Sequence, residues 1–138
     1  ESVIVPTGII EVLLCGDQEI TQLNRDFRSE DSSTDVLAFE MLEEDPETSE
    51  LIVGSIAVNC DLAYNKASNF VAFQDNKKLD KRNIAAGETL LYILHGILHF
   101  AGYDDDTPED RREMFEIASA VLLKLGYKSI PYDFELEV

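Results

Sequence analysis

The hydrophobic and polar positions along the chain follow two periods, one typical of strands and one typical of helices. A short β-rich run at 9–14, IIEVLL, predicts a first strand, and the Gly-Asp pair after it predicts a turn and the start of a helix. In DQEITQLNRDFR the apolar residues Ile20, Leu23 and Phe27 recur at helical spacing. The first part of the chain is therefore predicted to be a strand followed by an amphipathic helix.

Two further strands are predicted at 34–40, TDVLAFE, and at 51–59, LIVGSIAVN. An acidic, proline-containing segment, EEDPETSE, separates them, and two strands joined by so short a loop must pair antiparallel. The 51–59 run is apolar almost throughout, which predicts a strand that is covered on both faces.

Three helices are predicted in the second half of the chain. They span about 61–73, 84–101 and 108–125. The middle helix has a wide apolar face, Gly102 is suited to end it, and Thr107 with Pro108 is suited to start the last helix. The order β-α-β-β-α-α-α indicates an α/β fold: one small domain over 1–138, with a mixed sheet of about four strands packed with helices.

The composition indicates a soluble globular domain. The 138 residues are 45% apolar and 28% charged, and no apolar run approaches the ~20 residues that a membrane-spanning helix needs. Cys15 and Cys60 each lie in an apolar segment without a metal-binding spacing, and we expect buried core thiols, with a disulfide as the alternative. Free thiols favour a reducing compartment: the cytoplasm, or an organelle matrix if a transit peptide was removed.

The formal charge of −17 disfavours broad attraction to RNA, so a nucleic-acid partner would need a local basic patch. Four of the eleven basic residues fall within six positions. They form either an RNA-backbone contact or a solubilising loop, and they are Lys77, Lys78, Lys81 and Arg82.

The two histidines of the chain lie four residues apart, in HGILHFAGYDDD at 95–106. On a helix this spacing lets His95 and His99 point at one ion. A glycine that ends the helix lets the chain reverse, and Asp105 then supplies a third ligand. Three protein ligands with an open position are typical of a catalytic zinc site. The alternative is a coincidental pair followed by a solvated acidic turn, and spacing alone does not decide between them.

Three segments, HGILHFAGYDD, ITQLNRDFRSEDSSTDVLAFE and LIVGSIAVN, resemble motifs of one known family. They are similar to H-G-x-L-H-x-x-G-Y-D-H, L-N-x-x-Y-R-x-x-D-x-P-T-D-V-L-S-F and L-G-D-I-x-I-S of the YbeY family. Its members are single-domain, metal-dependent endoribonucleases of ribosomal RNA maturation and ribosome quality control. The resemblance runs from about residue 9 to 126 and implies a YbeY-like domain with a zincin-like metal-binding helix.

The chain departs from the family's motifs at several positions, and one of these departures matters for the metal site. The third metal ligand that the resemblance implies is a histidine, and Asp105 stands in its place. Zinc accepts a carboxylate oxygen at about 2.0–2.2 Å, so a His-His-Asp site is chemically reasonable. The aspartate lowers the net charge of the site, which weakens the ion as a Lewis acid and shifts preference slightly toward manganese or magnesium. Asp104 and Asp106 are alternative ligands, although the resemblance implies that Asp104 supports a ligating histidine instead.

Metzincin proteases share part of this spacing, but they keep a glutamate as general base directly after the first histidine. Gly96 stands there, which disfavours peptide hydrolysis by that route. We expect Gly96 to give a bulky substrate close access to the metal.

Arg28 is the residue expected to stabilise a scissile phosphate. The resemblance places the matching arginine in a cleft facing the metal, and a planar guanidinium suits phosphate better than lysine does. The alternative is a solvated arginine paired with Asp31 or Asp35. Arg25 is expected to be a surface charge, and no residue is assigned as general base.

The function implied by the resemblance is a metal-dependent endoribonuclease that acts on ribosomal RNA, and zinc is the expected metal. The acidity of the chain fits this function only if docking on a basic ribosomal protein replaces bulk attraction to RNA. Two alternatives stay open. One is a metallohydrolase of peptides or small molecules, and the other is a catalytically impaired binding protein of ribosome assembly.

Overall fold

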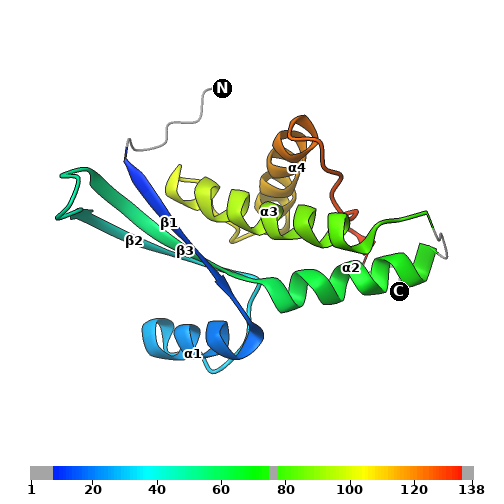
Figure 1. Ribbon diagram of the computed structural model, residues 1–138, viewed down its shortest axis with the longest axis horizontal. Helices are drawn as coiled ribbons and strands as arrows, with labels where there is room; N and C mark the ends of the chain where they lie inside the picture. The colour runs from blue at the N-terminus through cyan, green and yellow to red at the C-terminus, as the bar shows by residue number, and fades with distance from the viewer. Residues whose placement is uncertain (1–7, 75–77, 135–138) are drawn as a thin grey trace.

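The computed structural model describes residues 8–74 and 78–134 (Figure 1). Its elements follow the order β1 (Ile9–Cys15), α1 (Asp17–Arg28), β2 (Val36–Glu44), β3 (Leu51–Asn59), α2 (Cys60–Gln74), α3 (Lys81–Phe100) and α4 (Pro108–Lys124). The predicted succession of strands and helices is thereby confirmed, with boundaries that move by a few residues.

The sheet is mixed, as predicted. β1 pairs parallel with β3, and β2 pairs antiparallel with β3. The described residues form three strands in the order β1-β3-β2, so the expected count of about four is not confirmed. These strands are the three segments in which the sequence has a strand-like pattern. β3 is central, and its second half is buried because helices pack on both of its faces.

β2 runs past its predicted end at residue 40 into the acidic segment, where Glu43 and Glu44 pair with the start of β3. The register shifts between Glu40 and Glu43, and Leu42 has a positive φ of 51°. Backbone pairing with β3 outweighs the poor strand propensity of glutamate here, and the bulge absorbs the extra residues.

Helices cover both faces of the sheet (Figure 1). On one face, Ala57 of β3 and Leu37 of β2 pack with Ile20 of α1. On the other face, Ile56 of β3 packs with Tyr92 of α3. Successive residues of a strand point to opposite faces, so the same strand contributes to both cores. α4 forms a further core cluster with α3, which gives the layers α1, sheet, α3 and α4.

The long helix α3 begins at Lys81, earlier than predicted, because the Asp80 side chain accepts a hydrogen bond from the Arg82 backbone N–H at 3.0 Å. Thr107 caps α4 as predicted, with its hydroxyl accepting from the Asp110 backbone N–H at 3.0 Å. Among the described residues, no helix is both long and apolar enough to cross a membrane.

Candidate metal centre

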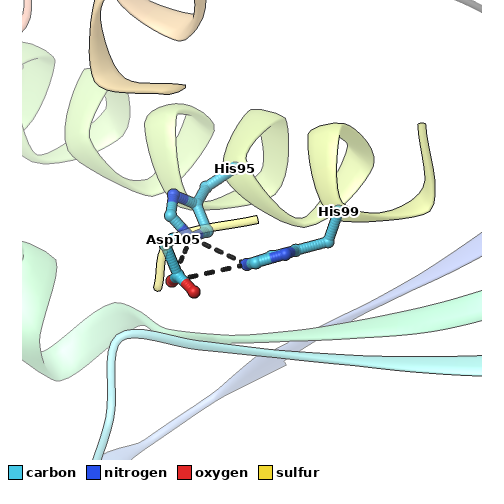
Figure 2. Close-up of side chains that lie close together, drawn as sticks. All are labelled: His95, His99 and Asp105. Atoms are coloured by element: carbon cyan, nitrogen blue, oxygen red, sulfur yellow. Dashed lines mark hydrogen bonds and ion pairs between the residues drawn. The ribbon is translucent and has the colours of Figure 1, made fainter. Parts of the chain in front are cut away.

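His95 and His99 project from the same side of α3 (Figure 2). Between them, α3 is held against the sheet at Gly96, where a Cβ would lie 2.8 Å from Ile56 Cγ2 in the core. The glycine therefore lets the helix approach β3, and our expectation that it opens the metal to a bulky substrate was wrong. A glutamate there would be driven into the sheet, so the general base of a metzincin protease has no room.

A tight turn after α3 carries the third side chain of the site back to the histidines. Gly102 has a φ of 98°, and the Tyr103 backbone N–H donates to the Leu98 carbonyl at 3.0 Å. The helix end predicted at Gly102 is thus confirmed. Beyond it, the Asp105 carbonyl accepts a hydrogen bond from Arg111 Nη1 at 3.0 Å, which clamps the loop to α4.

Three ligand-type atoms converge in this metal cluster of His95, His99 and Asp105 (Figure 2). The two histidine Nε2 atoms lie 3.0 Å apart, and Asp105 Oδ2 lies 3.4 Å from that of His95 and 3.6 Å from that of His99. A tetrahedral ion about 2.0–2.2 Å from each ligand requires ligand atoms about 3.3–3.6 Å apart. Both separations that involve Asp105 fall in that range, and the separation between the histidine nitrogens is slightly shorter, so the residues fit a divalent ion.

The hydrogen bonds of the cluster also favour a cation. His99 Nδ1 lies 3.2 Å from the Tyr103 carbonyl oxygen, which can only accept, so Nδ1 carries the proton and Nε2 of the neutral ring presents a lone pair. That lone pair faces the Asp105 carboxylate, another acceptor. If His95 Nε2 carried a proton, it could donate to His99 Nε2 and satisfy the contact between the rings. The His99 lone pair and the Asp105 carboxylate would still face each other as two acceptors. A cation satisfies both contacts.

Burial lowers the pKa of His95 below the ordinary value of imidazole, and the negative charge of Asp35 opposes this shift. His99 lowers the pKa further, and Asp105 raises it. A lowered pKa keeps the ring neutral near pH 7, and the neutral imidazole is the form that binds a metal.

A cleft of about 460 Å³, here called the Arg28 cleft, contains the metal cluster together with Arg28 at the end of α1. Arg28 Nη2 donates to the Ala38 carbonyl at 3.2 Å. No carboxylate among the described residues pairs with Arg28, because Asp31 is bound by Arg25, whose Nη2 lies 2.7 Å away. The alternative of a paired surface arginine therefore applies to Arg25, as expected, and Arg28 has N–H groups left for an anion.

A buried asparagine holds the loop that forms one wall of this cleft. Asn59, at 0% exposure, donates to the Thr34 carbonyl at 3.2 Å and to Asp17 Oδ1 at 2.8 Å. Ser33 also donates to Asp17, and these bonds from Ser33 and Asn59 lower the pKa of the Asp17 carboxyl. The loop that carries Asp35 is thereby tied to both α1 and β3.

Asp104 is exposed, and its described contacts are with neighbours in the loop and in α4. Its carboxylate accepts from the Asp106 backbone N–H at 3.4 Å, and a hydrogen bond with Asp110 raises its pKa. The resemblance implies that Asp104 supports a ligating histidine, but neither of these two contacts is with His95 or His99.

The predicted basic patch lies at the start of α3 and just before it. Lys81 and Arg82 open the helix roughly 20 Å along its axis from His95. Lys78 precedes them, and Lys77 lies outside the described residues. A patch at this end of α3 could contact RNA only at a distance from the metal cluster.

Sequence reasoning missed three polar side chains around the cluster. Glu88 lies seven residues before His95, two turns along the same helix, so helical periodicity was a signal that could have found it. Arg111 and the influence of Asp35 on His95 depend on how two loops fold back, and no spacing in the sequence indicates that.

A helix that carries two histidines over a mixed sheet, with a carboxylate returning from the following loop, defines a small α/β domain with a candidate metal site. The family model described as "Endoribonuclease YbeY" matches residues 3–126, and the chain belongs to this family.

Curated relatives named Endoribonuclease YbeY are about one third identical to the chain. The one from Helicobacter pylori is 36% identical over 127 residues, which cover 91% of this chain and 80% of that protein. The one from Anaeromyxobacter sp. is 35% identical over 105 residues, which cover 76% of this chain and 48% of that protein. The chain thus spans about half the length of some curated relatives that it matches.

A solution structure of a Thermotoga maritima protein is also similar. It has a TM-score of 0.53 and 32% sequence identity, over 84% of this chain and 67% of that one.

Proposed function

We propose that the chain is a metal-dependent endoribonuclease that acts in ribosomal RNA maturation and ribosome quality control. The observation that carries this proposal is the metal cluster, whose two imidazole nitrogens and one carboxylate oxygen lie within 4.8 Å of one another beside Arg28. The description of the family as an endoribonuclease supports phosphodiester chemistry for this arrangement.

The Arg28 cleft supplies what phosphodiester cleavage requires. A divalent ion held by the metal cluster supplies a Lewis acid and lowers the pKa of water. Arg28 binds the phosphate oxygens as negative charge builds on them, and its planar fork matches two oxygens at once. The bond from His99 Nδ1 to Tyr103 and the neutral state of His95 keep both rings ready to bind the ion.

The ion is zinc in this proposal. Two imidazole nitrogens suit zinc, and the separations of the three ligand atoms are compatible with a tetrahedral ion. The carboxylate of Asp105 adds a harder oxygen ligand, so manganese or magnesium are the metals that would compete.

The proposed substrate is ribosomal RNA, reached in the cytoplasm or an organelle matrix. A formal charge of −17 opposes bulk attraction to RNA, so docking on basic ribosomal proteins has to bring the cleft to its target. Binding to ribosomal proteins is therefore part of the proposal.

Metal analysis of the purified chain and of His99→Ala, Asp105→Ala and Asp104→Ala variants tests this function. We expect about one zinc ion per natural chain. Asp104→Ala should retain this ion, and His99→Ala and Asp105→Ala should lose it. Cleavage of ribosomal particles should decrease in the variants that lose the metal. A chain without stoichiometric metal that copurifies with ribosomal subunits would instead be a binding protein of ribosome assembly. Turnover of casein or esters with RNA untouched would identify a different hydrolase.

A further inference from the structure

A second cavity, of about 480 Å³, adjoins the metal cluster. It shares Asp35, His95 and Asp105 with the Arg28 cleft, so a molecule bound at the cluster can reach both hollows. Its other walls come from α2, α3, α4 and the segment 130–134 after α4. Sites for small organic groups typically have volumes of roughly 300–1,000 Å³, which includes this one. It is called the aromatic cavity below.

Aromatic rings with fixed positions line this cavity. The centroids of Tyr132 and Phe115 lie 5.0 Å apart with the rings inclined at 47°, and the Arg112 guanidinium carbon lies 4.9 Å from the Tyr132 centroid. Arg112 is held in turn by Asp133, whose two carboxylate oxygens each accept from Nη2 at 2.9 Å. Proteins that recognise single-stranded RNA stack unpaired bases on such aromatic side chains.

A charge pair, made of a buried carboxylate and a partly exposed lysine, also lines the aromatic cavity. Glu88 is 4% exposed, and its Oε2 lies 3.8 Å from Lys66 Nζ. A buried ion pair is weak evidence for a role in stability, because desolvation offsets the attraction. The pair gives the cavity an acceptor and a donor side by side, and nucleobase edges carry both kinds of group. A purely apolar ligand would cover these charges without offering them a hydrogen bond.

Arg111 connects the aromatic cavity with the metal cluster. It lines the cavity and donates from Nη1 to the carbonyl of Asp105. Base and phosphate of a nucleotide are joined through one ribose, so a nucleotide with its phosphate at the cluster has its base within reach of this cavity. The Arg28 cleft remains open to the sugar-phosphate backbone.

We propose that the aromatic cavity is a nucleobase subsite, which holds one unstacked base of the RNA beside the scissile phosphate. That the ligand is RNA rests on the proposed function. That the cavity binds a base rests on the aromatic rings and the charge pair that line it. Stacking on Tyr132 supplies affinity for any base. Glu88 sets the preference among bases, because an ionised carboxylate can only accept hydrogen bonds and so favours a base that presents an N–H group to it.

The test compares the nucleoside 3′- and 5′-monophosphates of the four bases with ribose 5-phosphate, which lacks a base. In NMR titrations of the zinc-loaded full chain, the nucleotides should bind roughly 5- to 150-fold more tightly, the contribution of one stacked base. Tyr132→Leu should abolish this advantage, and Tyr132→Phe should keep it. Tyr64→Leu is the matched control, because Tyr64 is 49% exposed against 37% for Tyr132 and lies outside the cavity.

Equal binding of nucleotides and ribose 5-phosphate would overturn the proposal, and so would a nucleotide advantage that survives Tyr132→Leu. Glu88→Gln tests base preference, because it keeps the shape of the side chain and exchanges one acceptor for a donor. The affinities of at least two nucleotides should change relative to each other by about tenfold, whereas Tyr132→Leu should weaken all four together. Lys66→Met tests the same pair if Glu88→Gln does not fold.

If a folded Glu88→Gln or Lys66→Met chain binds the nucleotides in an unchanged order of affinity, the charge pair is not part of the subsite. Binding of mononucleotides needs no bond cleavage, so this result is independent of the proposed function. Base-dependent binding by a chain that leaves ribosomal RNA intact would support the subsite and contradict the endoribonuclease. RNA cleavage without base-dependent binding would support the endoribonuclease and contradict the subsite.

Discussion

Asp105 sets the charge of the metal cluster. A carboxylate offsets one unit of the charge of a divalent ion, whereas the histidine implied by the family resemblance leaves that charge whole. The side chain is 42% exposed, and its loop is fixed through its carbonyl by Arg111. The hydrogen bond from Arg111 to the backbone carbonyl therefore positions residue 105, and substitution of its side chain leaves this hydrogen bond in place.

Asp105→His should raise the preference of the site for zinc over manganese by about tenfold or more, because a third imidazole replaces a hard oxygen ligand. RNA cleavage by the zinc form should increase, since the ion becomes a stronger Lewis acid. Competition titrations with both metals measure the first effect, and cleavage of ribosomal particles measures the second. A variant with lower zinc preference than the natural chain would contradict the role given to Asp105.

Arg28→Ala should lower kcat for RNA cleavage by about 100-fold while metal content stays unchanged, because one donor to the developing charge is lost. Arg28→Lys should recover only part of the activity, since an ammonium lacks the planar fork. Arg25→Ala is the matched control and should retain activity, because Arg25 is paired with Asp31 at the surface. Equal losses in Arg25→Ala and Arg28→Ala would point to a general charge effect instead.

The lowered pKa of His95 predicts a pH dependence of the metal-free chain. Above about pH 6.5 the imidazole is neutral in both folded and unfolded states and has no effect. As the pH falls below that value, the unfolded chain takes up the proton first, so the free energy of unfolding decreases until the lowered folded pKa is passed. Urea unfolding of the chelated chain and of His95→Gln between about pH 8 and pH 5 isolates this contribution, which should be missing in the variant.

At the scale of elements, the helix α3 contributes to the site in three ways. It carries both histidines, packs on β3 through Gly96, and ends at Phe100, after which the turn at Gly102 brings the next loop back to the site. The spacing of the histidines and the turn at Gly102 were predictable, because both depend on local helix geometry. The reason for Gly96 was not, because it depends on which side chain of β3 faces the helix.

Gly96→Ala should lower the free energy of unfolding by about 1–2 kcal/mol. Overpacking against Ile56 costs ~1–3 kcal/mol, and the better helix propensity of alanine offsets up to ~1 kcal/mol. Zinc affinity should fall as well, since α3 has to move away from β3. Denaturant unfolding and zinc titration measure the two effects.

Ile56→Val provides the control, because it removes one of the methyl groups that the new Cβ would meet. The double variant should lose less stability than the sum of the single variants. Strict additivity would mean that Gly96 is required for another reason.

Sequence patterns also identified most of the architecture and of the metal cluster, for physical reasons that are local. Strand and helix periods, the Thr107 cap and the antiparallel pairing of β2 with β3 all follow from near neighbours in the chain. The extension of β2 into an acidic segment and the cavity between α3, α4 and residues 130–134 depend on tertiary packing. No periodic pattern carries that information.

At the scale of the whole molecule, the charge of −17 has to be reconciled with the proposed RNA substrate. Of the clustered basic residues, Lys78, Lys81 and Arg82 lie at or just before the start of α3, remote from the metal cluster, so these three do not create an attractive field around the cleft. Long-range electrostatics therefore slow the encounter with free RNA. A ribosomal particle offers basic proteins as well as RNA, and these can attract an acidic surface.

This balance predicts opposite salt dependences for two substrates. Repulsion between the chain and a free single-stranded RNA is screened by salt, so kcat/KM for that RNA should rise or stay level between about 50 and 200 mM salt. The proposed docking on basic ribosomal proteins would be attractive and would weaken with salt, so kcat/KM for ribosomal particles should fall over the same range. At low salt the particles should be the better substrate. Equal rates with the same steep loss on both substrates would mean that the chain binds RNA as a basic nuclease does, and docking on ribosomal proteins would then have no role.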